Sequence, residues 1–121
     1  MEQVRFIEHK KKRILIVDLS NSLGAETTGA ILKAARESID IQPLKSLLLL
    51  TDVTGTHYDT DGAEALKAYT KANTPFVKAS AAVGVVGIKL ILYRAIVKIT
   101  GRKIAAVDSV EAGLDWLAEQ G

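Results

Sequence analysis

A short polar loop behind a run of four leucines holds most of the side chains that could do chemistry in this chain of 121 residues. The stretch Leu47–Leu66 reads LLLLTDVTGTHYDTDGAEAL, so a hydrophobic strand pattern leads directly into hydroxyl groups, carboxylates and one histidine. Open α/β folds place their sites where a buried strand ends in such a loop ahead of a helix. The stretch therefore predicts a site, and its candidate residues are Asp52, Thr54, His57, Tyr58, Asp59, Thr60 and Asp61.

Two interpretations would make this loop a centre of metal binding or catalysis. Asp18, Asp52, Asp59 and Asp61 could meet at one edge of a parallel sheet, where their oxygen atoms would suit Mg²⁺. The sequence lacks, however, paired neighbouring carboxylates and a lysine partner at a strand end. His57 beside Asp59 lacks a nucleophile in a pattern such as G-x-S-x-G. We therefore expect a non-enzymatic protein with no catalytic residue, no metal and no cofactor.

The acidic residues of the loop also suit a structural role. Asp61 followed by Glu64 fits a capping box at the start of a helix, with Asp61 as the cap. Asp59 and Thr60 are of residue types that favour turns and caps. Two interpretations stay open: a helix cap, and a docking or phosphorylation surface at a helix N-terminus, where backbone N–H groups favour negative charge.

A second candidate region is the very apolar helix expected over Ile88–Thr100. Gly84 and Gly87 precede it, either as a tight turn or as a cradle for a phosphate or carboxylate near Lys89. The helix has more apolar residues than one helical face can hold, so some of them must be covered by something other than the sheet. A homodimer face, the wall of a pocket for an apolar ligand and a membrane-surface patch are the alternatives. We favour burial combined with a partner contact, and the candidate residues are Ile88, Lys89, Leu92, Tyr93 and Ile96.

Composition limits the class of protein. Apolar residues make up 48% of the chain and charged residues 25%, which is typical of one globular domain spanning residues 1–121. Basic and acidic residues are nearly balanced, and the resulting net charge of +2 is too small to indicate a nucleic-acid partner. The absence of cysteine excludes disulfides and thiolate metal sites. The N-terminus shows no apolar signal segment, and three cations interrupt the apolar run 79–99, so we expect a cytoplasmic protein without an integral membrane segment.

Hydrophobic periodicity predicts five strands and four helices. The expected strands are Val4–His9, Arg13–Ser20, Lys45–Val53, Phe76–Val83 and Lys103–Val107. The expected helices are Leu23–Ile39, Asp61–Asn73, Ile88–Thr100 and one that follows a cap at Asp108 or Ser109. After an opening antiparallel hairpin, each strand is followed by a helix, which predicts right-handed crossovers. The fold class is therefore α/β, with a mostly parallel five-stranded sheet.

The loop and the element order resemble the STAS superfamily, which includes the anti-sigma-factor antagonists and has the sporulation stage II AA-like fold. Its strand-to-helix motif has the form D-[LF]-S-G-V-x-[FY]-x-D-S-S-G-L. Asp52, Thr54, Gly55 and Tyr58 match its first half, and Asp59-Thr60 with Gly62 match D-S-x-G when one residue is deleted. The ending GIKLILYRAIVKITGRKIAAVDSVEAGLDWL is similar to that of small stand-alone bacterial STAS-like proteins.

This resemblance implies a regulatory module that docks a protein partner through the loop after the third strand and the helix behind it. In the anti-sigma-factor antagonists the second hydroxyl of D-S-S-G is the usual phosphorylation site. Here Asp61 stands at that position and Thr60 is the neighbouring acceptor, so a permanent charge at Asp61 would partly imitate phosphorylation. The alternative is a carrier or sensor of a small apolar or lipid-like ligand, because CRAL-TRIO lipid-binding domains share the general fold.

Overall fold

The computed structural model describes residues 2–22 and 25–121, in which five strands and four α-helices follow one another as the sequence predicts. Their ends differ from the predicted ends by at most two residues, and Leu23, the predicted start of the first helix, lies outside the described residues. The strands are β1 (Val4–His9), β2 (Lys12–Asp18), β3 (Leu47–Asp52), β4 (Val77–Val83) and β5 (Ile104–Val107). The helices are α1 (Ala25–Ile39), α2 (Thr60–Asn73), α3 (Lys89–Thr100) and α4 (Val110–Gln120), and a 3-10 turn, Thr74–Phe76, joins α2 to β4.

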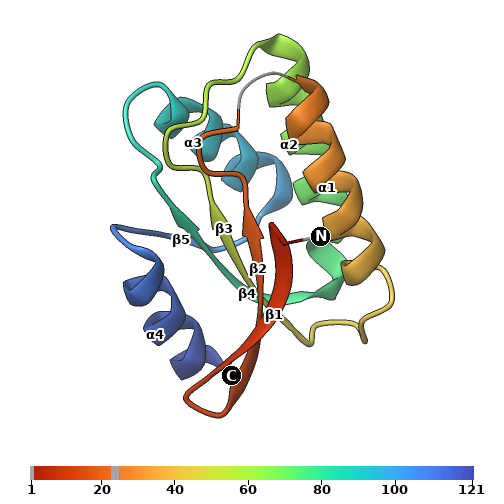
Figure 1. The fold of residues 1–121 in the computed structure, drawn as a ribbon, viewed down its shortest axis with the longest axis vertical. Coiled ribbons are helices and arrows are strands. Elements are labelled where there is room, and N and C mark those ends of the chain that lie inside the picture. The colour runs from red at the N-terminus through yellow and green to blue at the C-terminus, as the bar shows by residue number, and fades with distance from the viewer. Residues whose placement is uncertain (1, 23–24) are drawn as a thin grey trace.

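The five strands form one sheet whose spatial order, β1-β2-β3-β4-β5, is also their order along the chain. β1 and β2 pair antiparallel, and β2 to β5 pair parallel. The predicted α/β class, the opening hairpin and the mostly parallel sheet are thus confirmed. Because the parallel strands advance in one direction and such crossovers share one hand, α1, α2 and α3 all lie on the same face of the sheet (Figure 1).

α4 covers the opposite face, where it packs mainly on β3 and β4 (Figure 1). The contiguous apolar runs of β2 and β3 explain this double cover, because successive side chains on a strand point to opposite faces. Leu15 and Leu49 lie in the core beneath α1 to α3, whereas Ile14 and Leu50 lie in the core beneath α4. Both cores therefore depend on the same two strands.

The helix boundaries follow recognisable end signals. Gly101 ends α3 in the left-handed conformation, with φ of 68°, which is the stop that the sequence predicts. Ser109 caps α4 by accepting a hydrogen bond from the backbone N–H of Ala112 at 3.1 Å. None of the described helices combines the length and the apolar character needed to span a bilayer.

Candidate functional site

The loop between β3 and α2 is held by hydrogen bonds among its own residues. Asp52 Oδ1 accepts from the backbone N–H of Thr54 at 3.0 Å, which forms a turn at the end of β3. The buried Thr56 hydroxyl donates to the carbonyl of Val53 at 2.7 Å. Thr54 and His57 are exposed, and Tyr58 is half-buried. The loop is thus a fixed turn that presents part of the predicted residues at the surface.

Asp59, and not Asp61, is the cap of α2. Asp59 has extended backbone, and its Oδ1 accepts from the backbone N–H of Gly62 at 2.8 Å. The predicted capping box of Asp61 with Glu64 is therefore wrong, because α2 begins one residue earlier than expected, at Thr60. Glu64 lies instead within 3.3 Å of Lys67. Thr60 and Asp61 are both exposed in the first turn of the helix, so the Asp61 carboxylate remains at the surface.

The aspartates considered for a metal site do not gather. Asp18 and Asp52 are register partners on β2 and β3, yet each carboxylate serves its own turn. Asp18 Oδ1 accepts from the backbone N–H of Ser20 at 2.9 Å, and Asp52 bonds to the loop that follows it. Among residues 2–22 and 25–121 no three histidine, aspartate or glutamate side chains lie close enough together to hold a metal ion.

The side chain of His57 is exposed and makes no hydrogen bond among those found in the described part of the chain. The histidine that does contact a carboxylate is His9, whose Nε2 lies 2.7 Å from Asp115 Oδ1. This contact joins the β1–β2 hairpin to α4, far from the loop. The structure therefore does not assemble the catalytic set considered for His57 and Asp59.

The loops after β3 and β4 lie against each other. Gly84, with φ of 84°, approaches Thr54 so closely that a Cβ there would lie 2.7 Å from the Thr54 Cα. Lys89 at the start of α3 donates from Nζ to the carbonyl of Val53 at 2.9 Å. Gly84 is thus a position of close packing, whereas a Cβ at Gly87 would meet nothing within 4 Å. The turn brings α3 beside the loop of the first candidate region.

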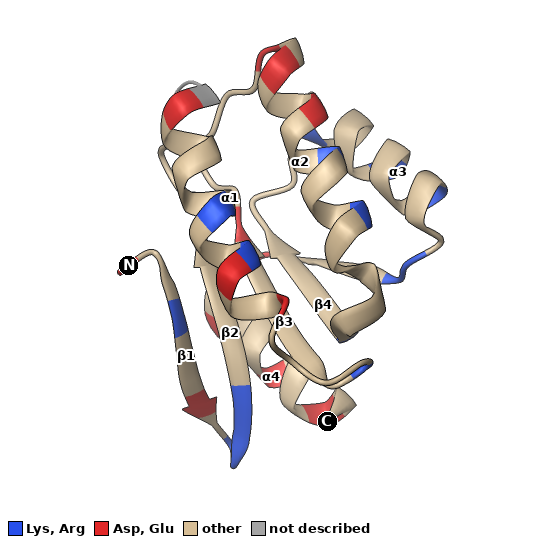
Figure 2. Ribbon diagram, turned by 90° about the vertical axis from the view of Figure 1, so that its right-hand side faces the viewer, with Lys and Arg blue, Asp and Glu red and all other residues tan. Residues whose placement is uncertain are grey.

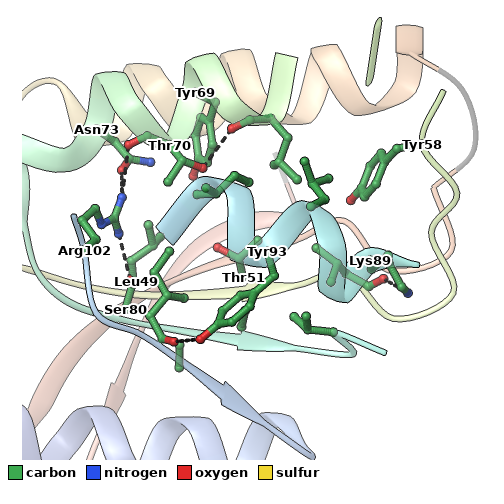
Figure 3. A pocket seen from close by; sticks show the side chains of 18 residues that line it. Leu49, Thr51, Tyr58, Tyr69, Thr70, Asn73, Ser80, Lys89, Tyr93 and Arg102 are labelled. Atoms are coloured by element: carbon green, nitrogen blue, oxygen red, sulfur yellow. Dashed lines mark hydrogen bonds between the residues drawn. The ribbon is translucent and has the colours of Figure 1, made fainter. Parts of the chain in front are cut away.

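A cavity of about 70 Å³ lies between α2, α3 and the strands β3 to β5 (Figure 3). Four of the five residues predicted on the apolar helix line it: Lys89, Leu92, Tyr93 and Ile96. Ile88 does not, since 82% of its surface is exposed. Of the predicted loop residues Tyr58 alone lines the cavity. The structure thus divides the candidate residues between an exposed surface and a partly open cavity.

Most polar groups around the cavity have partners within the protein. Tyr93 donates its hydroxyl to the carbonyl of Ile104, and Thr70 donates to the carbonyl of Leu66 at 2.9 Å. Three buried groups have none among the described residues: the hydroxyls of Tyr58 and Tyr69 and the side-chain amide nitrogen of Asn73. An unsatisfied buried polar group costs about 1–3 kcal/mol, so these three require an explanation.

Arg102 is the residue of this site that the sequence does not single out. Its Nη1 donates to the carbonyl of Thr70 at 3.2 Å and to Asn73 Oδ1, and its Nη2 donates to Ser80 Oγ at 2.8 Å. Burial lowers the pKa of its guanidinium from the ordinary value. The sequence feature that could have indicated this role of Arg102 is Gly101, because a left-handed stop turns the chain from α3 back to the sheet and directs the next side chain toward α2 and β4.

The β4–α3 turn and the first turn of α3 expose three apolar side chains, whereas Arg94 and Lys98 are exposed further along the helix. Val86, Ile88 and Ile91 are 68%, 82% and 67% exposed. Acidic residues lie in the first turns of the neighbouring helices, Glu26 in α1 and Asp61 in α2, and Figure 2 shows these acidic helix ends on the same side of the molecule. The apolar residues thus stand close to a negatively charged edge.

Comparisons of this chain with protein-family models, with curated proteins and with solved structures find no match. Two features of the described residues therefore bear on function. One is the exposed surface around the β3–α2 loop, and the other is the cavity beneath α3.

Proposed function

We propose that this chain is a non-enzymatic regulatory module of the STAS-like type, which binds a protein partner through the β3–α2 loop and the adjoining start of α3. The observation that carries this proposal is the cluster of exposed apolar side chains beside exposed carboxylates. We call this set the docking surface, and it consists of Asp59, Thr60, Asp61, Val86, Ile88 and Ile91.

Residues adjoining the two halves of the docking surface connect the β3–α2 loop to the start of α3. Lys89 bonds to the carbonyl of Val53, and Tyr58 lines the same cavity as Val85 and Lys89. A partner that contacts Ile88 therefore lies within reach of the loop. Exposed apolar residues that lie together in this way are typical of interaction sites.

Charge indicates the chemistry of the partner. Neither Asp59 nor Asp61 belongs to an ion pair of the described residues. A partner segment with an apolar side chain flanked by lysine or arginine would cover the isoleucines and neutralise these carboxylates. Thr60 lies between them, so its phosphorylation would add charge at the N-terminus of α2 and strengthen the attraction for basic residues.

The proposal is tested by affinity capture from the native host with the wild-type protein and three variants. Ile88→Ser and Asp61→Lys should each remove the same partner, because they remove the apolar contact and reverse the charge. Ile41→Ser is the matched control, since Ile41 is 79% exposed but lies in the α1–β3 connection, outside the docking surface. A partner that is retained by both docking variants, or lost equally with the control, would contradict the proposal.

Self-association is the competing outcome of the same experiment. Size-exclusion chromatography with light scattering measures the mass of the wild-type protein and of Ile88→Ser. We expect a monomer in both cases. A wild-type dimer that Ile88→Ser dissociates would assign the surface to a second copy of this chain and overturn the heterologous partner.

The cavity favours a second candidate function, which is the binding of a small apolar ligand as a carrier or sensor. Lys89, Leu92, Tyr93 and Ile96, four of the five residues predicted on the apolar helix, line this partly open cavity. The volume of about 70 Å³ is roughly half of the 150 Å³ that accommodates benzene in an engineered cavity, so a lipid chain would need α3 to move outward. Native mass spectrometry of the purified protein tests this function: a co-purifying lipid supports the carrier, and a bare chain argues against it.

A further inference from the structure

One end of the cavity beneath α3 gathers hydrogen-bond donors that lack acceptors. Figure 3 shows Tyr69, Asn73 and Arg102 at this end, and Tyr58 and Lys89 at the other. Tyr69 is 5% exposed and Asn73 is fully buried, yet neither the Tyr69 hydroxyl nor the Asn73 amide nitrogen makes a hydrogen bond of good geometry to the described residues. The Asn73 side chain does lie near enough to the Tyr69 hydroxyl to oppose the rise in pKa that burial causes there. Tyr69 and Asn73 are four residues apart on α2, so they lie on one face of that helix.

The charge around the cavity is entirely positive. Its lining contains Lys89 and Arg102 but no aspartate or glutamate. Arg102 belongs to none of the ion pairs of the described residues, and its partners are a carbonyl, an amide oxygen and a hydroxyl. Arg102 is half-buried, and a cation partly withdrawn from water is ordinarily stabilised by a nearby carboxylate. The described lining of the cavity supplies no such carboxylate.

We propose that the cavity binds a small organic carboxylate. The carboxylate group of the ligand is placed against Arg102, the Asn73 amide nitrogen and the Tyr69 hydroxyl, and its apolar body lies on Leu92 and Ile96. A carboxylate has two oxygens that accept several hydrogen bonds, so one group satisfies donors that are otherwise unmet and neutralises the guanidinium. The inference rests on the second candidate function, the ligand cavity, and is independent of the docking surface.

α3 is the element that would admit such a ligand. Ile96 is its single buried residue, whereas α2 buries Gly62, Leu66, Tyr69, Thr70 and Asn73. The first residues of α3 also lack a side-chain cap. An outward shift of this helix therefore loses less packing than a shift of α2, and it enlarges the cavity on the side of Leu92.

The test compares straight-chain carboxylates, from butyrate to octanoate, with the primary amides of the same length. Binding is followed by ¹H–¹⁵N NMR spectra of the whole chain, which give both the dissociation constant and the residues that shift. We expect at least one carboxylate to bind at least tenfold more tightly than its amide, because charge-assisted hydrogen bonds are about twice as strong as neutral ones. The shifts should concentrate on α2, α3 and Arg102.

Three variants test which side chains cause the preference for the carboxylate over the amide. Arg102→Gln should abolish the tenfold preference for the carboxylate. Tyr69→Phe, which keeps the ring, should weaken carboxylate binding several-fold while raising the urea midpoint of the free protein, because it removes an unsatisfied hydroxyl. Tyr58→Phe is the matched control at the opposite end, and it should leave the preference unchanged. If Arg102→Gln does not fold, Tyr69→Phe and Tyr58→Phe still decide the matter.

Three other outcomes would each contradict the inference, and they can be told apart. Equal binding of carboxylate and amide in the cavity would leave the apolar ligand site standing and overturn its specificity for an anion. No binding of either probe would overturn the ligand cavity as well. A preference for the carboxylate that persists in Tyr69→Phe and Arg102→Gln would place the anion elsewhere and refute the assignment.

Discussion

The carboxylate of Asp59 determines where α2 begins, because it accepts a hydrogen bond from the N–H of Gly62 that the helix itself leaves unpaired. We expect Asp59→Ala to lower the free energy of unfolding by about 1 kcal/mol. Asp61→Ala, two positions further on, removes a carboxylate near the helix N-terminus and should cost less, about 0.3–1 kcal/mol. Urea unfolding of the two variants measures the difference. A larger loss of unfolding free energy for Asp61→Ala than for Asp59→Ala would instead support Asp61 as the cap, as the sequence predicts.

Asp115 on α4 links the two ends of the chain through His9 and Lys10, at 2.7 and 3.1 Å. The hydrogen bonds from these two side chains hold the pKa of Asp115 below its ordinary value of 3.8. A lowered pKa in the folded state stabilises the protein above the unfolded-state pKa, and this contribution is lost as the pH falls through the folded-state pKa. Asp115→Asn should therefore reduce the urea midpoint at pH 7 and have less effect at about pH 3. An equal effect at both pH values would contradict this linkage.

At the scale of elements, α4 lies close to the sheet because Gly113 faces it. A Cβ at Gly113 would lie 2.5 Å from Leu50 Cδ1 and 3.2 Å from Val107 Cγ2. Leu50 is fully buried, so it cannot turn away without disturbing the core. Gly113→Ala should therefore destabilise the protein by about 1–3 kcal/mol, although alanine is the better helix former.

Gly29 in α1 provides the matched control for this prediction. An added Cβ at Gly29 meets nothing within 4 Å, so Gly29→Ala should stabilise the protein by about 0.5–1 kcal/mol through helix propensity alone. Thermal or urea unfolding of the two variants compares them directly. Stabilisation by both substitutions would show that α4 can move away from Leu50 at little cost.

At the scale of the whole molecule, the two cores share strands, so we expect them to unfold together. β2 sends Ile14 to the face under α4 and Leu15 to the opposite face, and β3 does the same with Leu50 and Leu49. Removal of α4 would expose the first face to water, including Ile14 and Leu50. We expect a chain that ends at Asp108 to lose the dispersed ¹H–¹⁵N spectrum of a folded protein. Retention of such a spectrum would mean that the α1–α3 side folds by itself.

Much of the fold is predictable from local patterns in the sequence. Contiguous apolar runs such as Ile14–Val17 indicate strands buried on both faces, and alternation with helices indicates parallel pairing. Gly101 and Ser109 mark helix ends by their residue type alone. These features depend on neighbours within a few positions, which explains why element boundaries are found to within two residues.

The candidate site was less predictable, because it depends on which residues meet across the fold. Two acidic residues near one helix start offered two caps, and only the exact first turn of α2 distinguishes Asp59 from Asp61. Ile88 and Ile96 belong to one apolar helix, yet the first is exposed and the second is buried. Apolar residues occur on more than one face of this helix, so their spacing in the sequence does not show which of them face the sheet.

By itself, then, the sequence determined the elements, their order and the polar loop after β3, since each follows from the spacing of neighbouring residues. Tertiary structure alone decided the position of Arg102, whose partners Thr70, Asn73 and Ser80 come from α2 and β4. The guanidinium appears in the sequence as one more surface cation after a glycine. Its partial burial arises because the turn at Gly101 directs it between a helix and a strand that lie more than twenty residues away along the chain.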